Sequence, residues 1–340
     1  MDYRHLARMT DETGMIQFSV GGEPDPESGY TVDDNARALM VALNMEDGER
    51  ERYAALYTRF LKEAQRPDGT WCNLRKDGVF LPDLDSEDCQ GRALLALSSA
   101  AASDLEEVSA LSREMLEKAL PANRRLHYLR SQAYTLIGLL NCTDVFEERR
   151  NSLLETAEEF AQNLIRCYQR TRGHGWYWFE EMVTYCNGIL PQALFAYYSF
   201  TGDRGARAIA RDSMLFLCDH LFARGYLNVV GNRGWWRRGE DAPLYDQQPV
   251  DACSMVLACR EAYLATGEKQ YLELAQLARE WYQGKNVNKM PLVNPETGGC
   301  HDALIPEGLN PNQGAEALLS LLYSEQVMQI LAPEGEAGRR

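Results

Sequence analysis

The chain has 340 residues, 45% hydrophobic and 25% charged, which is long enough for a substantial core and typical of an ordinary folded protein. Its 35 Lys and Arg against 50 Asp and Glu leave a net charge of −15, which disfavours nucleic acids and anionic membrane surfaces as partners. Because it shows neither a signal peptide nor a membrane-length apolar run, and its nine Cys sit mostly in apolar stretches, the sequence predicts a reduced, cytoplasmic protein without membrane insertion.

Apolar residues recur at helical spacing along most of the chain, and period-two alternation is limited to stretches near 71–80 and 225–230. A loop leading into a small, apolar helix occurs six times. The matching positions are Ala38, Ala93, Ala133, Ala193, Ala252 and Ala317. The steps between them are 55, 40, 60, 59 and 65 residues, each long enough for two helices and a loop.

More strongly charged amphipathic helices are expected between these six, at 50–65, 106–119, 149–170, 203–222 and 268–284, with 2–12 as a candidate sixth. The unusual loop residues gather just before the apolar helices, which favours a closed ring over an open α-solenoid. The sequence therefore predicts an all-α fold, an (α/α)6 toroid over residues 1–330, with short β-hairpins in its loops and a disordered tail at 331–340.

Aromatic residues are concentrated in the loops that precede the expected inner helices. Sugar rings stack on flat aromatic faces while their hydroxyls bond to carboxylates and amides, so these rings are candidates for binding a sugar. The alternative is that they pack the loops against one another. The candidates are Tyr30, Trp176, Trp178, Trp235 and Trp236.

Acidic residues collect in the same loops, and two carboxylates facing each other across a sugar are the minimum for cleaving a glycosidic bond. Glu180 and Glu181 follow an aromatic run that would desolvate a carboxyl group and raise its pKa, so one of them is the candidate acid. Asp34 or Asp88 is the candidate base.

Asp33 and Asp88 also permit a structural interpretation. Each begins an expected helix and has an arginine four residues later, Arg37 and Arg92 respectively, a spacing that allows helix capping and an ion pair within the helix.

Further residues of these loops are candidates for contacting a substrate. They are Asp33, Glu87, Arg237, Gln248, Asp251, His301, Asn312 and Gln313. Arg237 or Arg238 would hold an anionic group or pair with the neighbouring acids. Cys300 and His301 invite a zinc site, but no second cysteine lies at suitable spacing, so neither a metal nor an organic cofactor is expected.

Five segments together resemble a poorly characterised bacterial family of six-hairpin glycosidase-like proteins. They are 29–39 (GYTVDDNARAL), 87–94 (EDCQGRAL), 232–235 (NRGW), 246–249 (DQQP) and 312–316 (NQGAE). The resemblance implies an (α/α)6 fold and a mannose- or glucose-containing oligosaccharide handled in the cytoplasm. Because such proteins occur alone or joined to glycosyltransferase domains, it also implies a glycosyltransferase as a candidate partner.

One departure bears on activity, because Cys186 and the pair Gly188-Ile189 stand where an acid and an Ala-Arg pair are expected from the first motif. The sequence thus favours a glycoside hydrolase, and glycosidases of similar architecture often invert the anomeric centre. A sugar epimerase or isomerase and a non-catalytic glycan-binding partner of a glycosyltransferase are the alternatives. An epimerase would place a histidine at the axis, where only His174 and His301 lie in suitable loops.

Overall fold

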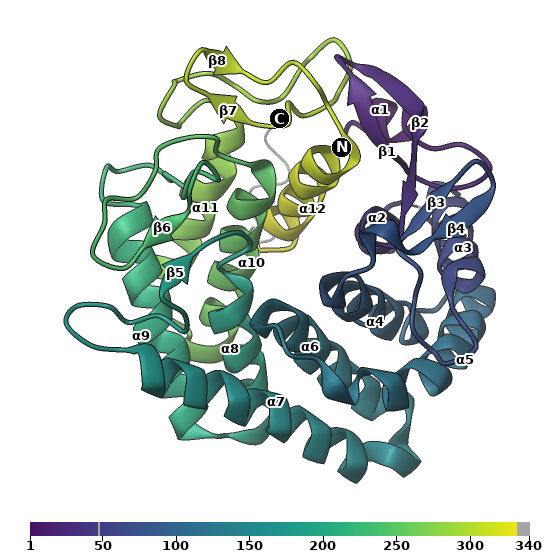
Figure 1. Cartoon of the computed structure of the whole chain (residues 1–340), viewed down its shortest axis with the longest axis horizontal. Coiled ribbons are helices and arrows are strands. Elements are labelled where there is room, and N and C mark those ends of the chain that lie inside the picture. Colours follow the sequence, from purple (N-terminus) through teal and green to yellow (C-terminus); the bar gives the residue numbers. More distant parts are fainter. Residues whose placement is uncertain (47, 332–340) are drawn as a thin grey trace.

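Six helices form a closed inner ring in the computed structural model, which describes residues 1–46 and 48–331 (Figure 1). They are α2 (Val32–Ala42), α4 (Glu87–Ala101), α6 (Leu129–Val145), α8 (Ile189–Thr201), α10 (Pro249–Thr266) and α12 (Ala315–Leu331). Each packs against the next, and α12 packs against α2. The ring is therefore closed, as predicted, rather than an open solenoid.

Five longer helices and one short one surround this ring. They are α3 (Glu49–Ala64), α5 (Glu106–Ala122), α7 (Arg150–Thr171), α9 (Arg204–Leu221), α11 (Gln270–Tyr282) and α1 (Arg4–Arg8). Each of the first five packs on the inner helix that precedes it, whereas α1 packs on α12. The beginning of the chain thus covers its last helix, and the predicted (α/α)6 toroid is confirmed.

Glycines let neighbouring inner helices approach closely. A Cβ atom on Gly91 of α4 would lie 2.7 Å from the backbone oxygen of Ser131 in α6. On Gly188, just before α8, it would lie 2.2 Å from the backbone oxygen of Ser254 in α10. Both distances are too short for a side chain, so these two contacts require glycine.

The strands are short and lie in the loops. The largest sheet is antiparallel, in the order β1 (Ile16–Val20), β2 (Glu23–Thr31), β3 (Leu74–Lys76) and β4 (Val79–Leu81). Two-stranded pairs join β5 (Met182–Val183) to β6 (Trp236–Arg237) and β7 (Leu304–Ile305) to β8 (Gly308–Leu309). The alternation near 71–80 is confirmed as a hairpin, but residues 225–230 form no strand.

Three short 3₁₀ helices complete the elements: η1 (Pro82–Leu84), η2 (Asn123–Arg125) and η3 (Glu147–Arg149). Apart from Leu331, which ends α12, the expected tail lies outside the described residues. Among the described helices, none is both long and apolar enough to cross a bilayer.

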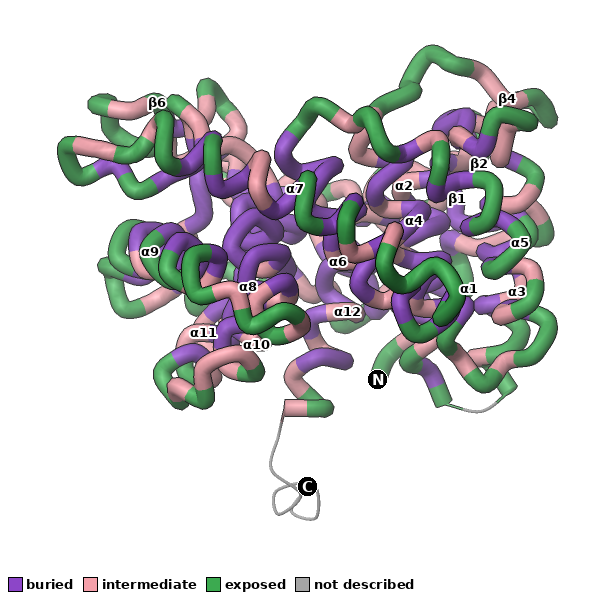
Figure 2. Tube along the Cα trace, turned by 90° about the horizontal axis from the view of Figure 1, so that it is seen from below, coloured by how far each residue is buried: buried purple, intermediate pink, exposed green. Residues whose placement is uncertain are grey.

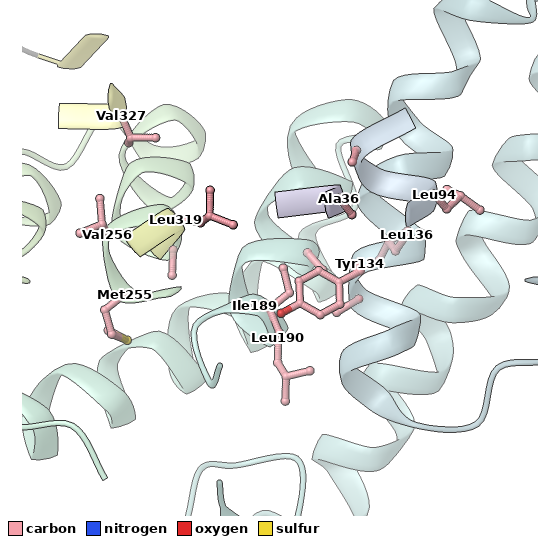
Figure 3. Packing of buried hydrophobic residues seen from close by; sticks show 14 of the residues in the cluster. Ala36, Leu94, Tyr134, Leu136, Ile189, Leu190, Met255, Val256, Leu319 and Val327 are labelled. Carbon is pink, nitrogen blue, oxygen red and sulfur yellow. The ribbon is translucent and has the colours of Figure 1, made fainter. Parts of the chain in front are cut away.

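The core lies among the inner helices and between them and the outer helices. Figure 2 shows buried residues gathered in the inner helices and exposed ones on the outer helices and loops. Figure 3 shows the contributions of several inner helices, among them Leu94, Leu136 and Val256. Trp71 is core as well, since its Nε1 donates to the backbone oxygen of Leu61 at 3.0 Å and its ring is buried. All nine cysteines are free and buried, as expected for a reduced protein.

Candidate active site

A cavity of about 830 Å³ opens where the inner helices begin, and we call it the axial cavity. Its lining comes from the first turns of α2, α4, α10 and α12 and from the residues that lead into α6 and α8. Eight of the lining side chains are acidic: Asp33, Asp34, Asp85, Glu87, Asp88, Asp246, Asp302 and Glu316. Only Arg37 and Arg92 are basic, so the cavity is strongly acidic.

The caps of α2 and α4 explain how acids come to face the axis. The Thr31 hydroxyl accepts from the backbone N–H of Asp34 at 3.1 Å, and the Ser86 hydroxyl accepts from that of Cys89 at 3.2 Å. The interpretation of Asp33 and Asp88 as caps is therefore wrong, because hydroxyl side chains hold those positions. The carboxylates of the first turn therefore do not act as caps, and they line the cavity.

Two half-buried arginines lie at the inner end of the cavity and join neighbouring helices. Arg37 pairs with Asp34 at 3.1 Å and with Glu316 of α12 at 2.6 Å. Arg92 pairs with Asp33 of α2 at 3.2 Å, and its distance to Asp88 in its own helix is 4.0 Å. The expected pair of Asp33 with Arg37 does not form, because Asp33 pairs with Arg92 of α4 instead, whereas the expected pair of Asp88 with Arg92 is present at 4.0 Å.

Beyond these arginines lies a second cavity of about 590 Å³, formed by the later turns of the inner helices. Its walls are mainly apolar, with Met40, Leu95 and Leu257 among them, and Arg37 and Arg92 line both cavities. Polar groups that could bond to a sugar are concentrated on the acidic side of the two arginines.

Burial raises the pKa of two cavity acids. It raises the pKa of Asp34 to about 6, although the charge of Arg37 and the Thr31 hydroxyl oppose the shift. Burial also raises the pKa of Asp302, whose Oδ1 accepts from the backbone N–H of Gly314 at 2.7 Å. Asp302 is thus a carboxyl group that holds its proton to higher pH than an exposed aspartate does.

Asp88 has a different environment on the same cavity wall. Its Oδ1 accepts from the Ser131 hydroxyl at 2.7 Å, and its Oδ2 accepts from the Tyr185 hydroxyl at 2.8 Å. Two donors from α6 and from the loop before α8 therefore fix the orientation of this carboxylate.

The structure does not bring Glu180 and Glu181 to the axial cavity. Both line a separate cavity of about 810 Å³ beside α6 and α7. Glu180 accepts from Arg130 at 2.8 Å, and Glu181 forms an ion pair with Arg238 at 3.4 Å while its side chain is 69% exposed. The predicted acid–base pair requires Glu180 or Glu181 to face Asp34 or Asp88 across one sugar. Because the two glutamates line one cavity and the two aspartates line another, the structure does not form that pair.

The tryptophan-rich loops pack against each other, which was the alternative to sugar binding. Trp176 and Trp236 are buried, with ring centroids 5.0 Å apart, and they lie 5.2 and 5.5 Å from the ring of Phe216 on α9. Trp178 is buried beside the same ring. Trp235 lies 6.1 Å from the ring of Tyr185, and none of these four lines the axial cavity.

Of the other predicted contact residues, Asp33, Glu87 and Gln248 line the axial cavity. Asp251 is buried outside it, with its Oδ1 accepting from the backbone N–H of Cys186 at 2.6 Å. Burial raises the pKa of Asp251 to about 8.

The remaining ones hold loops or face solvent. The Tyr30 hydroxyl donates to Asp11 at 2.6 Å, His301 contacts the backbone oxygen of Asn310 at 3.0 Å, and Arg237 is exposed. Asn312 accepts from the backbone of Gly21 at 2.9 Å, and Gln313 accepts from Thr297 at 2.6 Å.

Several cavity residues were not singled out as site residues from the sequence. Arg37 and Arg92 occupy matching positions in two motif helices, a pattern that predicts only an ion pair within each helix. Phe18 and Tyr128 line the cavity but follow no motif. Across residues 1–46 and 48–331, no three His, Cys, Asp or Glu side chains form a group that could hold a metal ion.

No protein-family model matches the chain, and no curated protein matches it in sequence. Solved structures do match in fold. A sugar epimerase from a ruminal bacterium has a TM-score of 0.73 and 13% identity over 97% of this chain and 94% of that one. A D-mannose isomerase has a TM-score of 0.70 and 13% identity over 96% of both chains. A GH76 α-mannanase from Bacteroides thetaiotaomicron has a TM-score of 0.61 and 13% identity over 89% and 88%. These likenesses show that the chain has the six-hairpin (α/α)6 fold.

Proposed function

We propose that the protein is a glycoside hydrolase acting on a mannose- or glucose-containing oligosaccharide in the axial cavity. The observation that carries this proposal is the set of carboxyl groups from α2, α4 and the segment before α12 around one space of about 830 Å³. Glycosidic bond cleavage needs one protonated and one ionised carboxyl group on opposite sides of a sugar. Neighbours in fold that are named for work on sugars support the substrate class.

Asp302 is the proposed general acid. Burial raises its pKa, which favours the protonated form that a general acid requires, and its Oδ2 accepts no hydrogen bond from the described residues. Asp34 also has a raised pKa, but its two oxygens are engaged by Thr31 and Arg37. We assign Asp34 the positioning of Arg37 rather than proton transfer.

Asp88 is the proposed general base. Ser131 and Tyr185 fix its carboxylate so that it can take a proton from water, while the proton of Asp302 goes to the departing glycosidic oxygen. Attack by this water on the face opposite the leaving group would invert the anomeric centre. A cytoplasmic location and a glycosyltransferase partner are retained as predictions of the family resemblance.

A sugar epimerase or isomerase is the second candidate, favoured by the TM-scores of 0.73 and 0.70 against 0.61 for the mannanase. Such a reaction moves a proton on carbon and needs a base there, often histidine. No histidine of the described residues lines the axial cavity, which is why we place hydrolysis first.

The test is to incubate the protein with manno- and gluco-oligosaccharides and follow them by mass spectrometry and by NMR of the anomeric protons. Hydrolysis adds the mass of water and the first anomer formed reports the stereochemistry, whereas epimerisation leaves the mass unchanged. We expect Asp302→Asn and Asp88→Asn each to lower kcat by about 10²-fold or more.

Glu181→Gln serves as the matched control, since it neutralises an acid outside the axial cavity. Loss of cleavage in Glu181→Gln with retention in Asp302→Asn would reverse the assignment in favour of the acid predicted from sequence. A change of sugar identity at constant mass would replace hydrolysis by epimerisation.

A further inference from the structure

Three large hydrophobic side chains are exposed around the mouth of the axial cavity. Phe18 of β1 is 54% exposed, Leu84 of η1 is 46% exposed, and Tyr128, just before α6, is 70% exposed. All three line the cavity although they come from separate segments. Single exposed hydrophobic residues need no explanation, but three around one opening indicate a binding surface.

Most of the exposed aromatic rings lie at this cavity. Among the described residues, only Phe18, Tyr128 and Tyr177 are aromatic and exposed, and the first two line this cavity. The tryptophans, by contrast, are buried or lie outside it. The surface that could stack on a sugar is therefore built from residues other than the tryptophans of the sequence motifs.

Each of the three residues is held by a bond from a side chain to its backbone. The backbone N–H of Phe18 donates to the Ser28 hydroxyl at 3.0 Å, and the backbone oxygen of Leu84 accepts from Asn73 at 2.8 Å. The backbone N–H of Tyr128 donates to Glu87 at 2.9 Å. These bonds fix the backbone at the three positions, so that binding has to order the exposed side chains alone.

Glu87 makes the strongest of these attachments. Its carboxylate accepts from the backbone N–H groups of both His127 and Tyr128, at 2.6 and 2.9 Å, and its other oxygen lies 2.8 Å from Nδ1 of His127. Glu87, which lines the axial cavity, thus also positions the backbone that carries the Tyr128 ring.

We infer that Phe18, Leu84 and Tyr128 form outer subsites for the sugar units beyond the bond at Asp302 and Asp88, so the substrate is longer than a disaccharide. Aromatic faces stack on the C–H faces of pyranose rings, while the acidic interior bonds to hydroxyls. The inference rests on the proposed function, because it assumes that a saccharide occupies the axial cavity.

The test compares binding of cello- and manno-oligosaccharides, from disaccharide to hexasaccharide, by calorimetry on the wild type, Tyr128→Ala, Phe18→Ala and Tyr177→Ala. We expect wild-type affinity to rise with length, and the first two variants to lose about three- to tenfold for the hexasaccharide, as single ring contacts do. Disaccharide affinity should not change. Tyr177→Ala removes an exposed ring outside the cavity and should bind as the wild type does.

The outcomes separate this inference from the proposed hydrolysis. Equal hexasaccharide affinity in wild type, Tyr128→Ala and Phe18→Ala would overturn the inference, even if disaccharides were cleaved. A length-dependent loss without any cleavage would retain the outer subsites and reject hydrolysis. If the wild type bound no member of either series, both the outer subsites and the proposed hydrolysis would be contradicted.

Discussion

At the scale of single residues, the candidate site is a set of acids whose environments differ sharply. Asp302 and Asp34 are desolvated, Asp88 accepts from two hydroxyls, and Glu181 is largely exposed. The sequence predicted that acids gather before the inner helices, and eight acidic side chains do line the axial cavity there. Which acid loses solvent could not be predicted, because desolvation depends on the segments that cover it.

Asp251 gives a pH-dependent prediction at this scale. Its pKa is about 8 against an ordinary 3.8, so the folded state prefers the protonated form. Its contribution to stability is complete below pH 3.8 and is lost as the pH rises to about 8. Asp251→Asn resembles the protonated acid. Between pH 4 and pH 8 we therefore expect the Tm of the wild type to fall by at least about 3 °C more than the Tm of Asp251→Asn.

The measurement is thermal unfolding between pH 4 and pH 9, with the exposed Asp241→Asn as the control. Parallel curves for the wild type and Asp251→Asn would show that Asp251 ionises in the folded protein as freely as in the unfolded chain.

At the scale of elements, small residues and caps decide how the inner helices meet. The six inner helices could be predicted because their alanines and glycines recur before a charged partner helix. The β1–β2 hairpin could not, because β2 shows no regular alternation of buried and exposed residues and carries Pro24 and Pro26, which give no strand pattern. The sequence also could not predict where the tryptophan side chains pack, since their partner Phe216 lies on α9, outside the motifs.

The hydroxyl cap of α2 does two things, and its removal should therefore have two effects. Thr31→Ala loses the bond to the Asp34 N–H, which should destabilise the fold by about 1 kcal/mol. It also loses the donor to the Asp34 carboxylate, so the pKa of Asp34 should rise above about 6. Urea unfolding and a carbon-13 titration of Asp34 measure the two effects.

Ser86→Ala is the matched control, because Ser86 caps α4 through the N–H of Cys89. It should lose similar stability and leave the titration of Asp34 where it was. A shift of the Asp34 titration in both variants would mean that the shift follows from general loosening of the ring.

Gly188 allows a direct test of the helix contacts. Because its Cβ would lie 2.2 Å from the Ser254 backbone oxygen, we expect Gly188→Ala to destabilise the protein by at least about 2 kcal/mol, or to prevent folding. Gly205→Ala on α9 meets only a carboxylate oxygen of Asp203 at 3.1 Å, which can move, and should cost less than about 1 kcal/mol. Equal stability of the two variants, measured in urea, would disprove the close contact.

At the scale of the whole molecule, the ring is closed by residues from both ends of the described chain. Leu6 and Met9 are fully buried, and His5 Nε2 donates to the backbone oxygen of Gln313 at 2.8 Å. The sequence indicated a sixth outer helix only weakly at 2–12, because five helical residues are too few for a clear pattern. Its position against α12 follows from closure of the ring, which no local signal encodes.

This arrangement predicts a large effect of a short truncation. Removing residues 1–9 uncovers α12 and leaves Gln313 without its histidine donor, so we expect a Tm at least about 8 °C lower, or loss of cooperative unfolding. Removing only residues 1–2 deletes an exposed ion pair between Asp2 and Arg4 and should change Tm by less than about 2 °C. Scanning calorimetry compares them, and two equal Tm values would show that α12 needs no cover.

The contact between His5 and Gln313 also bears on when the ring can close during synthesis. The two residues are 308 positions apart, so a ribosome that adds about 5 to 20 residues per second exposes the first roughly 15 seconds to a minute before the second. During that interval α1, which packs on α12 in the folded protein, has no α12 to pack against. The ring can therefore close only after the segment that carries Gln313 has been synthesised.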